Sequence, residues 1–217
     1  MIRILDCEKN KIIECAQNRG VEYFVHFTDI DNLEKILLYG LCSRDYLDKN
    51  NEAYYYNDEY RLDHCTNAIC LSVTSPNYKM FFKLRNDNPE IRWVVLAINA
   101  KKVLELDCAF NRTNAANSCM SSIPIKERMT VQAFEDMFYE RNDYSRQKMR
   151  LEDFETTDPQ AEILVFDRIP PSYIEFIHFQ SIRDYRAFEQ LLLQKGIYGG
   201  TSSSFFSCRR DYDYWRM

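Results

Sequence analysis

The sequence has few of the residues that build the commonest cofactor and metal sites. Its 217 residues include 5 glycines and 3 histidines, and its 8 cysteines are scattered without a Cys-x-x-Cys pair. Because glycine-rich loops cradle phosphates and clustered Cys and His bind zinc, we expect neither a Walker-type or dinucleotide loop nor a zinc site. The Gly-x-Ser-x-Gly elbow and the His-Glu-x-x-His helix are also missing, which excludes the common hydrolase and metalloprotease signatures.

Long apolar segments are missing too. There is no run of about 18 apolar residues, the length that a membrane span needs. The first residues, MIRILDCEKNKIIE, alternate charged and apolar side chains where a signal peptide would have an apolar core. We therefore expect a cytoplasmic protein with no membrane contact and with reduced thiols.

The composition is that of a folded domain with a substantial core. Hydrophobic residues make up 46% of the chain and aromatic residues 14%, within a mass of 26.0 kDa. We expect a single domain over 1–217, with its core in 21–180 and with a helix at 5–18 and the segment 183–217 as appendages. The 15 Tyr and 14 Phe suit both a core and a stacking surface, and composition does not separate these uses.

The net charge of −5 argues against a protein that coats nucleic acid by bulk electrostatics. Local charge differs from the total in two segments, around 79–92 and in 141–150. The second of these carries four cations against Asp143, namely Arg141, Arg146, Lys148 and Arg150. Either segment can meet phosphates, although a solvated face of mixed charge is the more common explanation.

Hydrophobic periodicity predicts an α+β chain without internal repeats. Helices are expected over 5–18, 28–40, 78–85, 101–106, 130–139 and 183–194, and strands over 21–27, 68–73, 91–98, 163–167 and 174–180. The polar segments 43–66, 107–122 and 140–161 are expected to be loops. No role is assigned to the tail 199–217.

Several residues mark the expected ends of the helices. Thr28 and Asp31 have the spacing of a capping box before the helix 28–40, and Gly40 stands where a left-handed residue ends a helix. Pro76 suits the first turn of the helix 78–85, and Thr130 is the expected cap of the helix 130–139.

One carboxylate, Glu162, stands at the mouth of an apolar strand. The loop Thr157-Asp158-Pro159-Gln160-Ala161 delivers it to the run Ile163–Phe166, which is typical of a buried strand. Charged groups at such edges are usually paired or functional, so Glu162 is the first catalytic candidate. An ordinary solvated acid before a strand is the alternative.

Other polar residues at strand ends form a dispersed set, which is weak evidence by itself. A lone histidine on a strand is more often a satisfied core residue than a ligand, and a lone arginine is more often an ion-pair partner. The set comprises His26, Thr28, Arg61, Ser72 and Asn77.

Five short segments, each weak alone, become specific when their order is considered. They are VHFTDIDNL at 25–33, NDEYR at 57–61, SPNYKMF at 75–81, TNAA at 113–116 and DPQAE at 158–162. Their order over residues 21–180 resembles the DarT family of DNA ADP-ribosyltransferase toxins. The first 20 residues and the C-terminal tail have no counterpart in this resemblance.

The resemblance implies an ADP-ribosyltransferase fold, with a split mixed and antiparallel β core of two small sheets and flanking helices around an NAD cleft. It also implies that NAD is consumed as a substrate, that no metal is needed, and that ADP-ribose is placed on a base in single-stranded DNA. The versions of SPNYKM and TNAA look more like the guanine-modifying branch than the thymine-modifying one. A DarG antitoxin with a macrodomain is the partner that the resemblance implies.

The resemblance also assigns roles to residues. Glu162 matches the catalytic glutamate, and Arg61 matches an arginine that positions NAD and assists transfer. His26 matches a histidine that holds the nicotinamide-side ribose. The remaining NAD-binding positions are Thr28, Asn32, Gly40 and Ser72, and the expected DNA-binding positions are Asn77, Tyr144, Arg146, Lys148, Arg150 and Phe154.

These residue types suit the chemistry. Cleavage of the nicotinamide–ribose bond develops positive charge on the ribose carbon, which a carboxylate stabilises more than it stabilises the ground state. The planar guanidinium of Arg61 suits a pyrophosphate, and an aromatic ring such as Tyr144 or Phe154 can stack on a base. Two alternatives stay open: a related transferase that acts on RNA or protein, and a non-catalytic, aromatic-rich interaction module.

Overall fold

The computed structural model describes residues 5–50, 54–55, 65–140 and 145–201. In this part of the chain the strands form one mixed sheet in the order β4-β5-β2-β1-β3-β6-β7. Neighbouring strands are antiparallel except for β6 and β7, which are parallel. The strands are β1 (Tyr23–Asp29), β2 (Ile69–Val73), β3 (Trp93–Asn99), β4 (Cys108–Asn111), β5 (Glu162–Val165), β6 (Ile174–Phe179) and β7 (Tyr198–Thr201).

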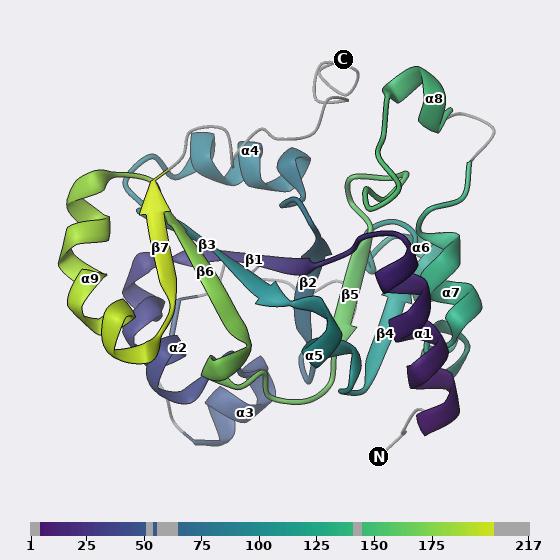
Figure 1. Cartoon of the computed structure of the whole chain (residues 1–217), viewed down its shortest axis with the longest axis horizontal. Helices are drawn as coiled ribbons and strands as arrows, with labels where there is room; N and C mark the ends of the chain where they lie inside the picture. Colours follow the sequence, from purple (N-terminus) through teal and green to yellow (C-terminus); the bar gives the residue numbers. More distant parts are fainter. Residues whose placement is uncertain (1–4, 51–53, 56–64, 141–144, 202–217) are drawn as a thin grey trace.

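Helices lie beside both edge strands of the sheet, and others lie above and below it in the view of Figure 1. Near β4 and β5 lie α1 (Asp6–Asn18) and α7 (Val131–Asp136), whereas α9 (Ile182–Lys195) lies beside β6 and β7. The other helices are α2 (Leu33–Tyr39), α3 (Arg44–Lys49), α4 (Tyr78–Asp87), α5 (Ala100–Leu104), α6 (Ser118–Ser121) and α8 (Arg146–Met149), with 3-10 turns η1 (Ile30–Asn32), η2 (Ile125–Arg128) and η3 (Pro171–Tyr173). The α+β architecture expected from the sequence is confirmed.

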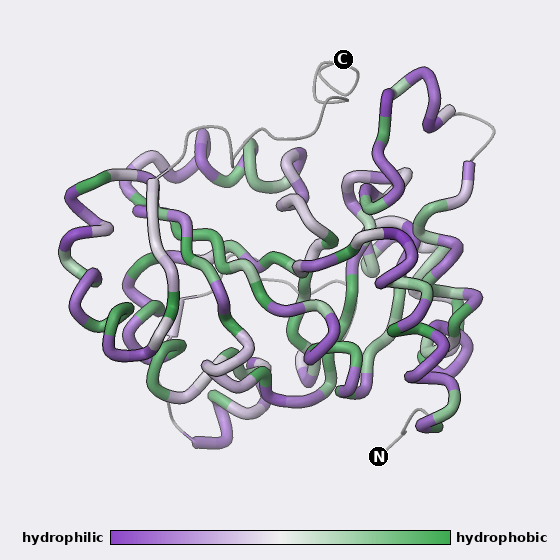
Figure 2. The backbone as a smooth tube through the Cα atoms, in the orientation of Figure 1, coloured by the Kyte–Doolittle hydropathy of each residue, from purple (hydrophilic) through white to green (hydrophobic). Residues whose placement is uncertain are grey.

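Much of the aromatic content belongs to the core. The largest fully buried side chains include Trp93, Phe24, Phe81, Phe110 and Phe134. Strand β3, expected from IRWVVLAI, is buried at six of its seven positions and is paired on both sides, by β1 and β6. Figure 2 shows the same concentration of hydrophobic residues along the strands.

The described strands form one continuous sheet and not the two small sheets that the family resemblance implied, but few residue pairs join the two halves of this sheet. Strands β1 and β3 pair along seven residues, whereas β1 and β2 pair only at Phe24 with Val73 and at Val25 with Ser72. Beyond Val25 the strands β1 and β2 separate. A short junction of this kind keeps a continuous sheet while it leaves room between two of its strands.

The expected capping box at Thr28 and the expected place of Pro76 in the first turn of a helix are wrong. Thr28 lies inside β1, and the N-cap of η1 is Asp29, whose carboxylate accepts a hydrogen bond from the Asp31 N–H at 3.0 Å. Asn77, and not a turn containing Pro76, begins α4, because its Oδ1 accepts from the Met80 N–H. In both places an Asx side chain reaches the first free N–H groups of the helix. The expected Thr130 cap of α7 is confirmed by its bond from the Ala133 N–H.

Five elements lie in segments that were expected to be loops or unassigned. Strand β4 lies within 107–122 together with α6, α3 lies within 43–66, α8 lies within 140–161, and β7 begins the tail. These elements are 4 to 6 residues long, too short for a periodic pattern to show. They form because of pairing and packing with distant residues, such as β4 against β5.

The helix α1 is fixed to the core by polar contacts. The ammonium of Lys9 lies 3.0 Å from the carboxylate of Asp107, at side-chain exposures of 17% and 8%. The carboxylate of Glu8 accepts a hydrogen bond from the Val131 N–H at 2.8 Å, at the start of α7. Helix α1 therefore supports α7 and the turn before β4.

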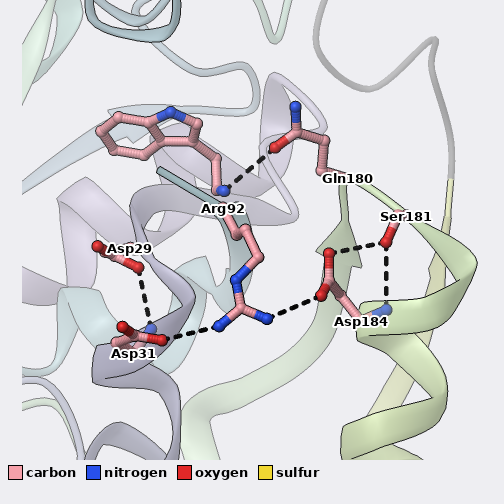
Figure 3. A network of polar contacts seen from close by, with 7 residues as sticks. Asp29, Asp31, Arg92, Gln180, Ser181 and Asp184 are labelled. Atoms are coloured by element: carbon pink, nitrogen blue, oxygen red, sulfur yellow. Dashed lines mark hydrogen bonds and ion pairs between the residues drawn. The ribbon is translucent and has the colours of Figure 1, made fainter. Parts of the chain in front are cut away.

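A polar network ties α9 to the turn after β1 (Figure 3). The guanidinium of Arg92 bonds Asp31 at 3.0 Å and Asp184 at 3.1 Å, and Ser181 donates to the second oxygen of Asp184 at 2.7 Å. The Ile30 N–H donates to the main-chain oxygen of Arg92 at 2.8 Å. Because Asp31 belongs to η1, this network fixes the turn that joins β1 to α2.

Candidate active site

A cavity of about 400 Å³ opens where β1 and β2 separate. Its volume falls in the range of small-molecule sites, roughly 300–1,000 Å³. Residues from β1, α2, α3, β2 and the start of β5 line it. Seven of the predicted site residues line this cavity, namely His26, Thr28, Asn32, Gly40, Ser72, Asn77 and Glu162.

Glu162 is held in place across three strands. It is the first residue of β5, opposite Ser72 of β2 on one side and Asn111 of β4 on the other. Its Oε2 accepts a hydrogen bond from the Ala115 N–H at 3.0 Å, and its main-chain oxygen accepts from Asn111 Nδ2 at 3.1 Å. The half-buried carboxylate is thereby oriented at the cavity wall.

A buried arginine supports this arrangement from behind. Arg128 is 5% exposed and Asn111 is fully buried. Nη1 of Arg128 donates to Asn111 Oδ1 at 2.6 Å, which fixes the amide so that its nitrogen faces the main chain of Glu162. Charge-assisted bonds of this length are the strong ones, so the start of β5 is rigid.

Ser72 and Asn77 meet on the same wall. Ser72 Oγ accepts a hydrogen bond from the Asn77 N–H at 3.2 Å, while Asn77 Oδ1 caps α4 by accepting from the Met80 N–H at 3.2 Å. Asn77 was predicted to contact DNA. In the structure it is the N-cap residue of α4 and lines the cavity.

His26 enters the cavity where β1 leaves β2. Its Nδ1 lies 2.9 Å from the carbonyl oxygen of Cys70. A carbonyl only accepts, so Nδ1 carries a proton, and in the neutral form of the ring Nε2 is then the acceptor nitrogen. The ring orientation is thus set by the neighbouring strand.

Thr28 and Asn32, which also line the cavity, are joined by a hydrogen bond. Asn32 Nδ2 donates to Thr28 Oγ1 at 2.9 Å and to the main-chain oxygen of Tyr55 at 2.7 Å. Asn32 Oδ1 accepts from the Tyr55 N–H at 2.9 Å. The amide of Asn32 therefore holds the backbone of Tyr55 as a neighbouring strand would, and this fixes part of the 43–66 segment against the cavity.

Residue 40 must be glycine because of its backbone conformation and because there is no room for a Cβ. Its φ of +88° and ψ of −179° lie in a region that is essentially open only to glycine, which differs from the left-handed helical conformation expected. A Cβ at this position would overlap the carbonyl oxygen of Ile169. The adjacent Leu41 pairs with Ile169, so a side chain at residue 40 would break this bridge.

Of the remaining predicted positions, Arg61 and Tyr144 lie outside the described residues, and the other four do not line the cavity. Lys148 and Arg150 are exposed on and after α8, Phe154 is half-buried against the core, and Arg146 bonds to oxygens of its own segment.

The sequence did not single out several cavity residues with suitable chemistry. Lys35, Arg44 and Arg168 line the cavity, in which Glu162 is the one carboxylate among the described lining residues. This balance suits an anionic group such as a pyrophosphate. Aromatic side chains that can stack on a flat ring also line it, at Phe27, Tyr39, Tyr46, Tyr54 and Tyr55. Their clustering depends on the fold, so no local pattern signals it.

Two residues outside the cavity have strongly shifted pKa values. Burial raises the pKa of the Cys108 thiol far above its ordinary value and lowers the pKa of His178 to about 4, and neither residue lines the cavity. Across the part of the chain that the structure describes, no group of three or more His, Cys, Asp or Glu is placed to hold a metal ion. None of the described helices has the length and apolar character to cross a bilayer.

A family model described as ssDNA thymidine ADP-ribosyltransferase, DarT, matches residues 25–199. A search of curated protein sequences found no match. The family match thus covers most of the chain and all seven predicted residues that line the cavity.

Solved structures show the same fold at low identity. A Thermus sp. 2.9 DarT in complex with NAD+ is similar with a TM-score of 0.58 and 15% identity, over 85% of this chain and 97% of that one. The same protein in complex with ADP-ribosylated ssDNA gives 0.56 and 15%, over 86% and 96%. Thermosipho africanus DarTG in complex with ADP-ribose gives 0.57 and 16%, over 85% of this chain but 51% of that chain, so the chain spans about half its length.

Proposed function

The chain belongs to the DarT family of ssDNA ADP-ribosyltransferases, and we propose that it uses NAD to place ADP-ribose on a base of single-stranded DNA. The observation that carries this proposal is that His26, Thr28, Ser72 and Glu162 line one cavity at the separation of two central strands. The cavity volume, its cations and its aromatic residues fit a dinucleotide. The NAD bound by a Thermus relative of the same fold supports the proposal.

Glu162 is the proposed catalytic group. Nicotinamide leaves with the electrons of its bond to the ribose, and the base nitrogen forms the new bond to the same carbon. The oriented carboxylate stabilises the positive charge that develops there and accepts the proton displaced from the base. The Ala115 N–H and the Asn111 amide keep Glu162 in one position during this step, which lowers the cost of orientation.

The other residues bind and orient NAD. We assign His26 to the ribose next to nicotinamide, since its acceptor nitrogen suits a hydroxyl. Asn32, which also bonds Thr28, holds the Tyr55 backbone at the cavity, and Gly40 and Ser72 complete the wall. Lys35, Arg44 and Arg168 are the proposed partners of the pyrophosphate. Arg61 keeps its proposed role in positioning NAD on the strength of the motif resemblance.

Guanine is the proposed acceptor base. The sequences Ser-Pro-Asn-Tyr-Lys-Met and Thr-Asn-Ala-Ala support it, while the description of the matching family names thymidine. The proposed DNA-contacting residues are Asn77, Tyr144, Lys148, Arg150 and Phe154.

We also propose that the protein is the toxin of a toxin–antitoxin pair with a DarG-type macrodomain partner. A Thermosipho africanus relative with this fold is described as DarTG, which supports such a pairing. Modified bases would block replication, and removal of ADP-ribose by the partner would relieve the block.

The experiment that tests the function uses NAD labelled on its adenylate half. The protein is incubated separately with single-stranded DNA, with RNA and with a bacterial protein extract. We expect label on DNA only, with equimolar release of nicotinamide. Label on RNA or protein would instead establish a related transferase, and the absence of both label and NAD consumption would indicate a binding module.

A further inference from the structure

We propose that Arg146 is a positioning residue, which holds residues 145–157 (the acceptor arm) in the shape needed for transfer to DNA and is not a phosphate contact. The arm carries α8 at its outer end and projects beyond α7 and β5 in Figure 1. The inference rests on the proposed function, because it concerns the acceptor strand.

The guanidinium of Arg146 is turned toward its own segment. Nη1 donates to the main-chain oxygen of Glu155 at 2.7 Å and to Thr157 Oγ1 at 3.1 Å. Nη2 donates to the main-chain oxygen of Glu152 at 2.7 Å. One side chain thereby joins the start of the arm to three positions near its end.

Further hydrogen bonds complete the closed loop. Glu155 is buried, and its Oε2 accepts from the Glu152 N–H at 2.9 Å. The Leu151 N–H donates to the main-chain oxygen of Arg146 at 3.1 Å. The arm thus has a defined shape before any strand binds, as a site that orients its substrate requires.

The arm is attached to the rim of the cavity. Thr74 Oγ1 donates to the main-chain oxygen of Phe154 at 3.3 Å, and Thr74 lies between the cavity residues Ser72 and Asn77. Thr74 has a φ of +59°, a conformation that β-branched residues avoid. Strained residues of this kind persist where the surrounding structure fixes them, often at functional sites. The shape of the arm is therefore coupled to the wall that carries Glu162.

The charges of the arm favour a structural role for Arg146 over a general electrostatic attraction of DNA. Exposed Lys148 and Arg150 are matched in number by two exposed acids later in the arm, Glu152 and Asp153. Arg146 and the buried Glu155 also carry opposite charges, so the arm as a whole has no net formal charge with which to attract phosphates.

The two possible roles of Arg146 predict different outcomes for the variant Arg146→Lys. A phosphate contact needs mainly the positive charge, which Arg146→Lys retains. The bonds to the oxygens of Glu152, Glu155 and Thr157 need the planar fork, which a lysine ammonium cannot reproduce. The conservative variant therefore separates the two roles.

The test compares wild type, Arg146→Lys, Arg146→Gln and Lys148→Gln as full-length proteins. Transfer of ADP-ribose to a single-stranded oligonucleotide is measured with NAD and DNA varied in turn, at several salt concentrations. Amide hydrogen exchange over 145–157 is measured on the same samples without DNA.

We expect Arg146→Lys and Arg146→Gln both to lower kcat/KM for DNA at least tenfold, with the KM for NAD unchanged and the arm exchanging faster. Lys148→Gln should leave the amide hydrogen exchange of the arm unchanged. It should reduce by about 1 the slope of the logarithm of the DNA-binding constant against the logarithm of the salt concentration. Transfer by Arg146→Lys within threefold of wild type, or an unchanged exchange pattern, would overturn the inference. A parallel rise in the KM for NAD would overturn it as well. Failure of wild type to modify DNA would count against the proposed function, while the exchange data would still test the role of Arg146.

Discussion

Ser72 and Glu162 stand directly opposite each other in the paired strands β2 and β5, and both line the cavity. Strand pairing therefore sets the position of the proposed catalytic carboxylate relative to the separation of β1 and β2. The same pairing brings residues that are 90 positions apart in the sequence to one cavity.

We expect Glu162→Gln to lower kcat at least about 100-fold, as losses of groups that stabilise developing charge do. The amide oxygen can still accept from the Ala115 N–H, so the fold and the Kd for NAD should stay close to wild type. Steady-state transfer and calorimetric NAD binding measure the two effects. Glu127→Gln, an exposed position on η2, is the matched control and should retain full activity.

His26→Ala removes the ring that the Cys70 carbonyl orients in the cavity. We expect the KM for NAD to rise about tenfold, since a hydrogen bond and ring contacts are lost together. His178→Phe removes a histidine from β6 that does not line the cavity. If both variants weakened NAD binding equally, the assignment of His26 would be wrong.

Gly40→Ala should lower the free energy of unfolding by at least about 2 kcal/mol. The alanine would strain the backbone, and its Cβ would also overlap the Ile169 carbonyl. Gly20→Ala is the control. Its φ is +73°, but no atom lies within 4 Å of the added Cβ, so only the strain of about 1 kcal/mol remains. Chemical unfolding of both variants measures the difference, and equal losses would contradict the steric argument.

The low pKa of His178 predicts a pH dependence of stability. Burial lowers the pKa from 6.5 to about 4 in the folded protein. Between these values the unfolded chain binds a proton that the folded chain does not, so the free energy of unfolding should fall as pH drops from 6.5 to 4. The half-buried side chain limits the contribution to on the order of 1 kcal/mol. His178→Phe should flatten this part of the profile, and an unchanged profile would exclude His178 as its cause.

The long, periodic elements could be predicted from sequence, and the short ones could not. Strand β3 and helix α9 have enough residues for their patterns to show. Strand β4 has four residues, all buried, and its role comes from pairing with β5. The choice of Asp29 over Thr28 as a cap depended on where β1 ends, which the local pattern does not settle.

The candidate site was predictable where a residue stood at the mouth of an apolar strand, as Glu162 does. Lys35, Arg44 and Arg168 were missed because a cation in a polar segment resembles any solvated side chain until the fold gathers it. Arg146 shows the reverse case, since a basic segment suggested phosphate binding whereas the structure turns its guanidinium inward.

Mass spectrometry of nucleosides provides the most direct test of the central claim. Single-stranded DNA is incubated with NAD and either wild type or Glu162→Gln, digested, and searched for each deoxynucleoside carrying ADP-ribose. We predict an adduct on one base, guanine by our proposal, with wild type and none with the variant. An absence of adducts on all four bases, or equal adducts with both proteins, would contradict the account.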